Sequence, residues 1–160
     1  MVITKNPLLN MKINEISSET AAFIAQNLKS DVQTLALKGA KTKGVDMTFA
    51  LSQIKGHQTS CTKLPLWAST EGIVFPVTLS LEQCSSQQTA EYKAQLLNRL
   101  SKGLDVEKMP ISSQKEGEKA TKTLSLTDLT GGFGVDFTLM AKQVNNSCYV
   151  EQQQTLCDIA

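Results

Sequence analysis

The stretch from Leu124 to Glu151, which begins LSLTDLTGGFGVD and ends CYVE, decides the fold of this chain. Its leucines at positions 124, 126 and 129 predict a short strand, with Asp128 near the carboxyl end of that strand. A helix over residues 135–144 and a second strand ending at residues 149–151 are predicted to follow. This order of strand, glycine-rich turn, helix, strand and acidic residue is typical of the first half of a nucleotide-type cofactor site.

Gly131, Gly132 and Gly134 are predicted to form the turn between the first strand and the helix. Glycine accepts a positive φ and has no Cβ that would collide with a ligand. The helix behind the turn begins with free N–H groups and the positive end of its dipole, which suits an anionic or carboxylate-bearing ligand. Glu151 follows at roughly the 20-residue separation at which an acidic residue holds ribose hydroxyls in dinucleotide-binding folds.

The glycine pattern narrows the choice of cofactor. A dinucleotide fingerprint requires Gly-x-Gly-x-x-Gly, but Phe137 stands at the position of the third glycine, and no Gly-Lys-Ser/Thr of a P-loop follows. What remains from Asp128 to Asp136 is Asp-x-Thr-x-Gly-x-Gly-x-Asp. Two alternatives stay open: a plain turn in another α/β protein, and a different adenine nucleotide, such as NAD or ATP, in the same loop.

A polar turn and a helix precede the first strand, over residues 80–103. Ser85 and Gln88 have the spacing of a capping box, which predicts the start of this helix. The turn is either an ordinary helix cap or a polar surface near a ligand. The apolar side of the helix is predicted to consist of Ala90, Ala94, Leu97 and Leu100.

Residues 11–78 are predicted to be mainly helical, because apolar residues recur at helical spacing after good capping residues. Trp67 is expected to pack against the end of this helical unit. Residues 73–75 fit either a short edge strand or an extended connection. The predicted caps of three helices are Ser18, Asp31 and Asp46, and the third helix is expected to end near Gly56.

Two units are therefore expected in this α/β chain. Residues 1–78 form an N-terminal helical unit, in which residues 1–10 are expected to be a disordered extension, and residues 79–160 form the cofactor-binding unit. Residues 104–123, which are rich in Lys, Glu, Ser and Gly, fit a solvated linker or a poorly defined helix.

Composition excludes several classes of protein. A net charge of +1 with 41% hydrophobic residues argues against a disordered acidic tail and against a strongly basic nucleic-acid binder. Four cysteines without a C-x-x-C pair indicate reduced thiols in a cytoplasmic protein. The sequence contains no apolar run long enough to span a membrane. His57 and Cys61 supply too few ligands for a metal site, so no bound metal is expected.

Residues 128–136 resemble the first motif of class I S-adenosylmethionine-dependent methyltransferases, in a variant where Thr130 replaces the first glycine. The turn over residues 81–86, the segment 149–152 and the early segment 35–38 extend this resemblance. Together they are similar to a family of bacterial class I methyltransferases that carry a THUMP-like domain near the C-terminus. The resemblance covers residues 11–160.

This resemblance implies an N-terminal helical unit followed by the first βαβ portion of a Rossmann-like fold, with S-adenosylmethionine as cofactor and RNA as the substrate of the intact protein. It implies that Gly132 and Gly134 lie against the methionine part of the cofactor and that Asp128 orients its ammonium group. It also implies that Glu151 binds the ribose, and that Gln83 or Ser85 lies near the carboxylate. The predicted cofactor-binding residues are Asp128, Thr130, Gly131, Gly132, Phe133, Gly134, Asp136, Glu151, Gln83 and Ser85.

The chain departs from that family in one respect. It ends shortly after Glu151, before the adenine-binding acid, the fourth-strand motif and the THUMP-like domain that the resemblance implies. We therefore expect a truncated product or an N-terminal fragment that binds the cofactor weakly and catalyses nothing alone. No catalytic residue is assigned, because Asp136, Glu82 and His57 have no partner at a diagnostic spacing. The alternative is a non-catalytic helical interaction module or a degenerate methyltransferase remnant.

Overall fold

The structure, a computed structural model, describes residues 16–38, 43–103 and 124–160. The expected disordered extension (1–10) and the expected linker (104–123) lie outside these ranges. In chain order the elements are α2 (Ser18–Asn27), α3 (Val32–Lys38), α4 (Met47–Lys63), α5 (Pro65–Ser69), α6 (Thr78–Gln83), α7 (Gln87–Gly103), β1 (Ser125–Asp128), α8 (Val135–Met140), the 3-10 helix η4 (Ala141–Gln143), β2 (Asn146–Tyr149) and α9 (Gln154–Cys157).

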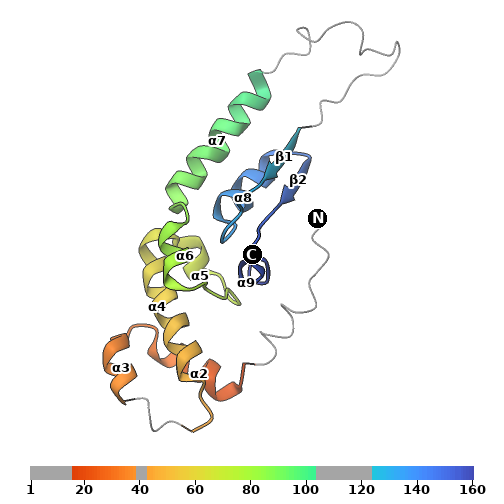
Figure 1. Ribbon diagram of the computed structural model, residues 1–160. Coiled ribbons are helices and arrows are strands. Elements are labelled where there is room, and N and C mark those ends of the chain that lie inside the picture. The colour runs from red at the N-terminus through yellow and green to blue at the C-terminus, as the bar shows by residue number, and fades with distance from the viewer. Residues whose placement is uncertain (1–15, 39–42, 104–123) are drawn as a thin grey trace, which may run out of the picture.

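The helices and the small sheet form one elongated arrangement (Figure 1). Helices α2, α3 and α4 occupy one end, α5 and α6 lie in the middle, and α7 runs along α8 beside the sheet. No helix within the described ranges is both long enough and apolar enough to cross a membrane.

Side-chain caps begin the N-terminal helices. The predicted caps Asp31 and Asp46 are confirmed, since their Oδ1 atoms accept hydrogen bonds from the backbone N–H groups of Thr34 (2.8 Å) and Phe49 (3.0 Å). The prediction of Ser18 is wrong, because Ser18 is already helical and Ser17 caps α2. Ser17 takes this role because its Oγ both accepts from the N–H of Thr20 (3.1 Å) and donates to the carbonyl of Gly44 (2.9 Å).

Helix α4 does not end near Gly56, as the sequence suggested, but continues to Lys63. Gly56 is buried inside it, and a Cβ at this position would lie only 2.4 Å from the Cβ of Phe75. This glycine therefore permits the close approach of another segment and is not a helix stop. His57 consequently lies within the helix, with its ring edge-on to the ring of Phe75 at a centroid distance of 6.2 Å.

Residues 73–75 form an extended connection, not a strand. The buried side chain of Gln53 satisfies the backbone of Phe75 in both directions. Its Nε2 donates to the Phe75 carbonyl (3.0 Å), and its Oε1 accepts from the Phe75 N–H (2.8 Å). A side chain from α4 thus takes the place of a neighbouring strand.

Strands β1 and β2 pair in parallel, with Asp128 opposite Tyr149, and α8 and η4 connect them. The predicted order of strand, glycine turn, helix and strand is present, but each element is shorter than expected. Leu129 lies beyond β1 and is 72% exposed, because the chain already turns at Asp128, whose Oδ1 accepts from the N–H of Thr130 (3.0 Å). The helix ends at Met140, four residues earlier than predicted, and β2 ends at Tyr149.

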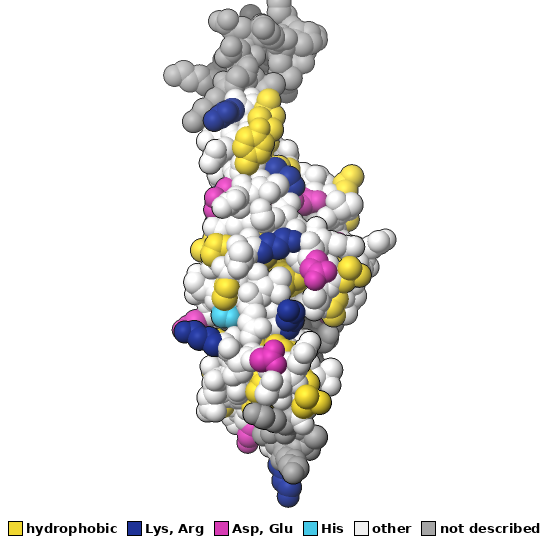
Figure 2. Space-filling model, turned by 90° about the vertical axis from the view of Figure 1, so that its left-hand side faces the viewer, with side chains coloured by type: hydrophobic (Ala, Val, Ile, Leu, Met, Phe, Trp, Pro, Cys, Tyr) yellow, Lys and Arg dark blue, Asp and Glu magenta, His cyan; other side chains and the backbone are white. Residues whose placement is uncertain are grey.

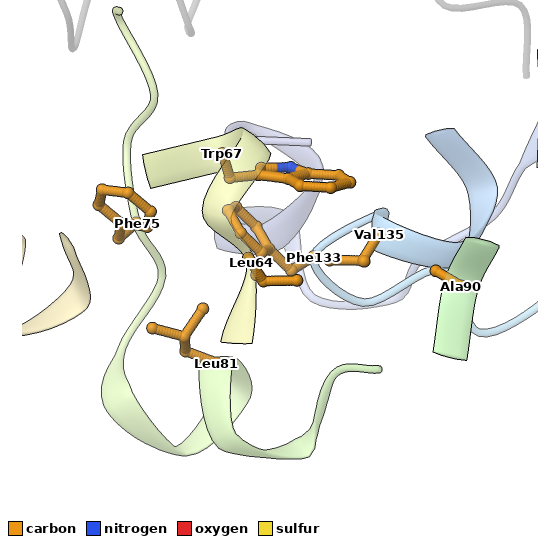
Figure 3. Close-up of a cluster of buried hydrophobic side chains, with 7 residues drawn as sticks. All are labelled: Leu64, Trp67, Phe75, Leu81, Ala90, Phe133 and Val135. Carbon is orange, nitrogen blue, oxygen red and sulfur yellow. The ribbon is translucent and has the colours of Figure 1, made fainter. Parts of the chain in front are cut away.

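The hydrophobic core connects the N-terminal helices to the glycine loop (Figure 3). The expected packing role of Trp67 is confirmed, since its side chain is buried in this cluster. The division of the chain at residues 78 and 79 stays a prediction, and the core draws residues from both sides of it. Its buried members are Leu64, Trp67, Phe75, Leu81, Ala90, Phe133 and Val135.

Candidate functional site

A cavity of about 410 Å³ lies where the glycine loop meets the turn between α6 and α7. Asp128 is not in this cavity but lines an adjoining one of about 430 Å³, which shares Lys93, Thr130 and Asp136 with the first. Gly134 is in neither lining and caps the start of α8. Of the predicted cofactor-binding residues, the first cavity brings together Gln83, Ser85, Thr130, Gly131, Gly132, Phe133, Asp136 and Glu151.

The glycines of the loop serve different purposes. Gly132 and Gly134 have φ values of +57° and +76°, in the left-handed region that favours glycine. The space above Gly132 is open, since the nearest atom to a Cβ placed there would be the carbonyl oxygen of Thr130 at 3.9 Å. Gly131 instead lies against the ring of Tyr149, and a Cβ at 131 would be 2.0 Å from Cε2 of that ring.

Tyr149, which the sequence indicated only as part of a strand, packs against the glycine loop and holds it in place. Its hydroxyl donates a hydrogen bond to the carbonyl of Gly132, and its ring meets the ring of Phe137 edge-on at 5.4 Å. Burial, with a smaller contribution from the Glu151 carboxylate, raises the pKa of the Tyr149 phenol. The hydroxyl therefore stays a proton donor to the loop.

Glu151 is held against the same loop. Its Oε2 accepts from the N–H of Gly132 (2.8 Å), and its Oε1 accepts from the N–H of Gln153 (2.7 Å). These hydrogen bonds, first from Gln153 and then from Gly132, hold the pKa of Glu151 below its usual value. Each carboxylate oxygen can accept a further hydrogen bond, so the group remains able to bind a hydroxyl.

The prediction of a capping box at Ser85 and Gln88 is wrong by one residue. Ser86 caps α7, because its Oγ accepts from the N–H of Thr89 (3.3 Å) and bonds to the Thr89 hydroxyl (2.9 Å). Ser85 is free for another contact, and its hydroxyl donates to Oδ2 of Asp136 (2.8 Å). A direct hydrogen bond across the cavity therefore links the turn between α6 and α7 to the first turn of helix α8.

Lys93 forms a polar cluster with Ser85 and Asp136, and the sequence analysis did not identify it. Its Nζ donates to Oδ2 of Asp136 (2.7 Å) and to Oγ of Ser85 (3.0 Å). The signal that could have identified it is its position: Lys93 lies three residues after the buried Ala90 and four before the half-buried Leu97, on the inner face of α7. A lysine on that face points toward the elements that α7 covers.

The turn that carries Gln83 and Ser85 is positioned by Lys63. Its Nζ donates to the carbonyls of Leu81 (3.0 Å) and Glu82 (2.5 Å) near the end of α6, where a cation is favourable.

Phe133 contributes differently from the other predicted residues. Its side chain is only 4% exposed and points from the loop toward Trp67 and Leu64 (Figure 3), so it anchors the loop in the core.

The remaining candidates for chemistry do not converge on this cavity. His57 lines a separate cavity of about 310 Å³, which Phe75 also lines, and its Nδ1 lies 3.7 Å from Sγ of Cys61. Glu82 lines none of the three cavities. In the part of the chain that the structure describes, no three His, Cys, Asp or Glu residues are grouped so as to hold a metal ion.

Glu151→Gln is expected to destabilise the protein at neutral pH, with a penalty that shrinks in acid. The folded-state pKa of Glu151 lies below its ordinary value of 4.5, so the ionised group stabilises the fold above that pH and this contribution is lost as pH falls through the folded pKa. Melting temperatures of wild type and variant, measured from neutral pH to about pH 3, should converge. A difference that stays constant with pH would contradict this role of the carboxylate.

Comparison with known proteins identifies a related fold. No family model matches the chain, and no curated protein matches it. A solved structure, that of a "putative methyltransferase from Porphyromonas gingivalis W83", is similar with a TM-score of 0.60 and 20% sequence identity. The similarity covers 100% of this chain and 32% of the other, so this chain spans about a third of that protein's length. The chain therefore has a helix-rich α/β fold like that of part of this methyltransferase-type structure.

Proposed function

We propose that this chain supplies the glycine-loop part of an S-adenosylmethionine site in a methyltransferase. The observation that carries the proposal is the open space above the left-handed Gly132, flanked by the fixed carboxylate of Glu151. The loop lies at the carboxyl end of β1, where open α/β sheets bind ligands. The likeness to part of a methyltransferase-type structure supports the same assignment.

The charges around the cavity favour this cofactor over NAD or ATP. The charged side chains that line it are the cation Lys93 and the carboxylates Asp136 and Glu151. S-adenosylmethionine carries a sulfonium, an ammonium and one carboxylate, whereas nucleotides carry anionic phosphates. The N–H of Gly132, which a phosphate would need, is already bonded to Glu151, so the loop is better suited to a cationic nucleoside.

When bound, the cofactor supplies an activated methyl group that is transferred by direct displacement. The task of the protein in such a reaction is to align donor and acceptor. In this chain the loop and Glu151 would hold the nucleoside, and the polar cluster of Ser85, Lys93 and Asp136 would meet its amino-acid end. We further propose RNA as the acceptor of the intact protein, which rests on the family resemblance of the motif alone.

Calorimetric titration with S-adenosylmethionine tests the proposal. Gly132→Ala and Glu151→Ala are each expected to weaken binding by at least about tenfold, because the first adds a methyl group beneath the ligand and the second removes the ribose acceptor. Gly72→Ala is the matched control: Gly72 also has a positive φ (+80°) and open space around it, but it lies outside the cavity of the glycine loop. It should bind like wild type.

Two results would overturn the proposal. The first is a folded wild-type protein that does not respond to S-adenosylmethionine. The second is preferential binding of NAD or ATP, which would assign the loop to a different adenine nucleotide. Equal loss of binding in Gly72→Ala and Gly132→Ala would show that the general cost of an alanine at a positive φ, and not contact with the ligand, is being measured.

A non-catalytic interaction module is the second candidate, and one observation favours it. Helix α7 exposes an apolar stripe at four-residue spacing, Tyr92 (62%), Leu96 (43%) and Leu100 (57%). Figure 2 shows hydrophobic side chains gathered over the upper part of α7, while basic and acidic side chains are interspersed elsewhere on that face. A folded protein that ignores all three nucleoside ligands would favour this reading.

A further inference from the structure

We propose that Lys93 makes the site selective for nucleosides that carry an amino-acid carboxylate. The inference rests on the proposed function and deepens it, because it names the group that distinguishes a complete methionine-derived cofactor from a shortened one. Its basis is the position of Lys93 at the boundary between the two cavities, both of which it lines.

The amino group of Lys93 is oriented by its neighbours and still has a donor to offer. An ammonium carries three N–H groups, of which two are used for Oδ2 of Asp136 (2.7 Å) and Oγ of Ser85 (3.0 Å). The side chain of Lys93 is 42% exposed, so a ligand in the cavity can reach it. Two fixed hydrogen bonds leave the third N–H in a defined direction, which lowers the entropic cost of binding a further acceptor.

The other described charged side chains that line the two cavities are carboxylates, so a ligand carboxylate needs Lys93 as its binding partner. Among the described side chains that line either cavity, Lys93 is the one cation, and the carboxylates are Asp128, Asp136 and Glu151. Three carboxylates repel a ligand carboxylate, while a hydrogen bond between an ammonium and a carboxylate is among the strong ones. Ser85 cannot replace Lys93 in this role, since its hydroxyl proton is already donated to Asp136.

The probes are S-adenosylhomocysteine and 5′-methylthioadenosine. Both contain adenosine and a thioether, but only the first carries the amino-acid end. Wild type is expected to bind S-adenosylhomocysteine more tightly. Lys93→Met should weaken binding of S-adenosylhomocysteine by roughly 10- to 100-fold, the loss of one charge-assisted hydrogen bond, and leave binding of methylthioadenosine unchanged. Lys93→Arg, which keeps the charge, should retain part of the preference.

A second variant keeps the test decisive if Lys93→Met unfolds. Oδ1 of Asp136 is buried and has no hydrogen-bond partner among the described residues, so removing Lys93 leaves the charge of Asp136 poorly compensated. The double variant Lys93→Met/Asp136→Asn removes both charges of the pair. It should fold, as circular dichroism can check, and should show the same loss of preference for S-adenosylhomocysteine.

The outcomes separate this inference from the proposed function. If wild type binds neither nucleoside, the proposed function fails and the selectivity role fails with it. If wild type binds both, and the lysine variants weaken both equally or neither, the proposed function stands and the role of Lys93 is overturned. Only a selective loss for the ligand with the carboxylate supports it.

Discussion

Gly131→Ala is expected to destabilise the protein by about 2–3 kcal/mol and to abolish binding of S-adenosylmethionine. The new methyl group would lie 2.0 Å from Cε2 and 2.7 Å from Cζ of Tyr149. The ring cannot easily yield, because its hydroxyl is bonded to Gly132 and its edge is packed against Phe137. Either the loop or the ring must move, and any movement of the loop displaces Gly132 from Glu151.

Denaturant unfolding of a double-mutant cycle checks the cause of this effect. In a Tyr149→Ala background the collision is absent, so the additional cost of Gly131→Ala should fall to within about 0.5 kcal/mol. Gly132→Ala is the comparison within the loop: it adds left-handed strain of about 1–2 kcal/mol but meets open space. The same cost of Gly131→Ala with and without the Tyr149 ring would show that the ring does not define the loop.

Phe133→Ala is expected to lower the free energy of unfolding by about 3–5 kcal/mol, the usual effect of deleting a large buried aromatic side chain. The Phe133 ring is nearly inaccessible to solvent and lies 6.4 Å, centroid to centroid, from the ring of Phe75. Its loss would leave a cavity beside Trp67 and loosen the loop directly after Gly132. We therefore also expect weaker binding of S-adenosylmethionine.

The fluorescence of Trp67, the only tryptophan, reports on this core during unfolding. Leu129→Ala is the matched control, because Leu129 lies a few residues earlier in the chain but is mostly exposed, and its replacement should change stability by no more than about 0.5 kcal/mol. If Phe133→Ala behaved like Leu129→Ala, the core would not extend from the helices to the loop. The two segments would then be energetically separate.

These effects have a common origin in the way the glycine loop is held. Phe133 fastens the loop to the helical core, while Tyr149 and Glu151 fasten it to the end of β2. A loop held on both sides is pre-organised, so little conformational entropy remains to be lost when a ligand binds. The turn of Ser85 belongs to the same framework, since Lys93 and Asp136 connect α7 and α8 around it.

Features that depend on neighbouring residues in the chain were predictable. The caps at Asp31 and Asp46 follow from short-range hydrogen bonding, and the left-handed turn at Gly132 and Gly134 follows from the conformational freedom of glycine. Local patterns were ambiguous where two equivalent side chains are adjacent. Distant partners decided which of two adjacent serines caps each helix. Ser17 caps α2 and also hydrogen-bonds to the carbonyl of Gly44, whereas Ser85 hydrogen-bonds to Asp136, which leaves Ser86 to cap α7.

By itself, the sequence determined the order of the elements around the glycine loop and the polar groups near it, because spacing and capping act over a few residues. Only the tertiary structure decided why Gly56 and Gly131 must be glycine, since Phe75 and Tyr149 approach them from 19 and 18 residues further along the chain. It also decided that Lys93 faces the cavity and that Phe133, which borders the cavity, buries its ring in the core. Close packing between distant segments sets these roles, and no local pattern encodes which segments will meet.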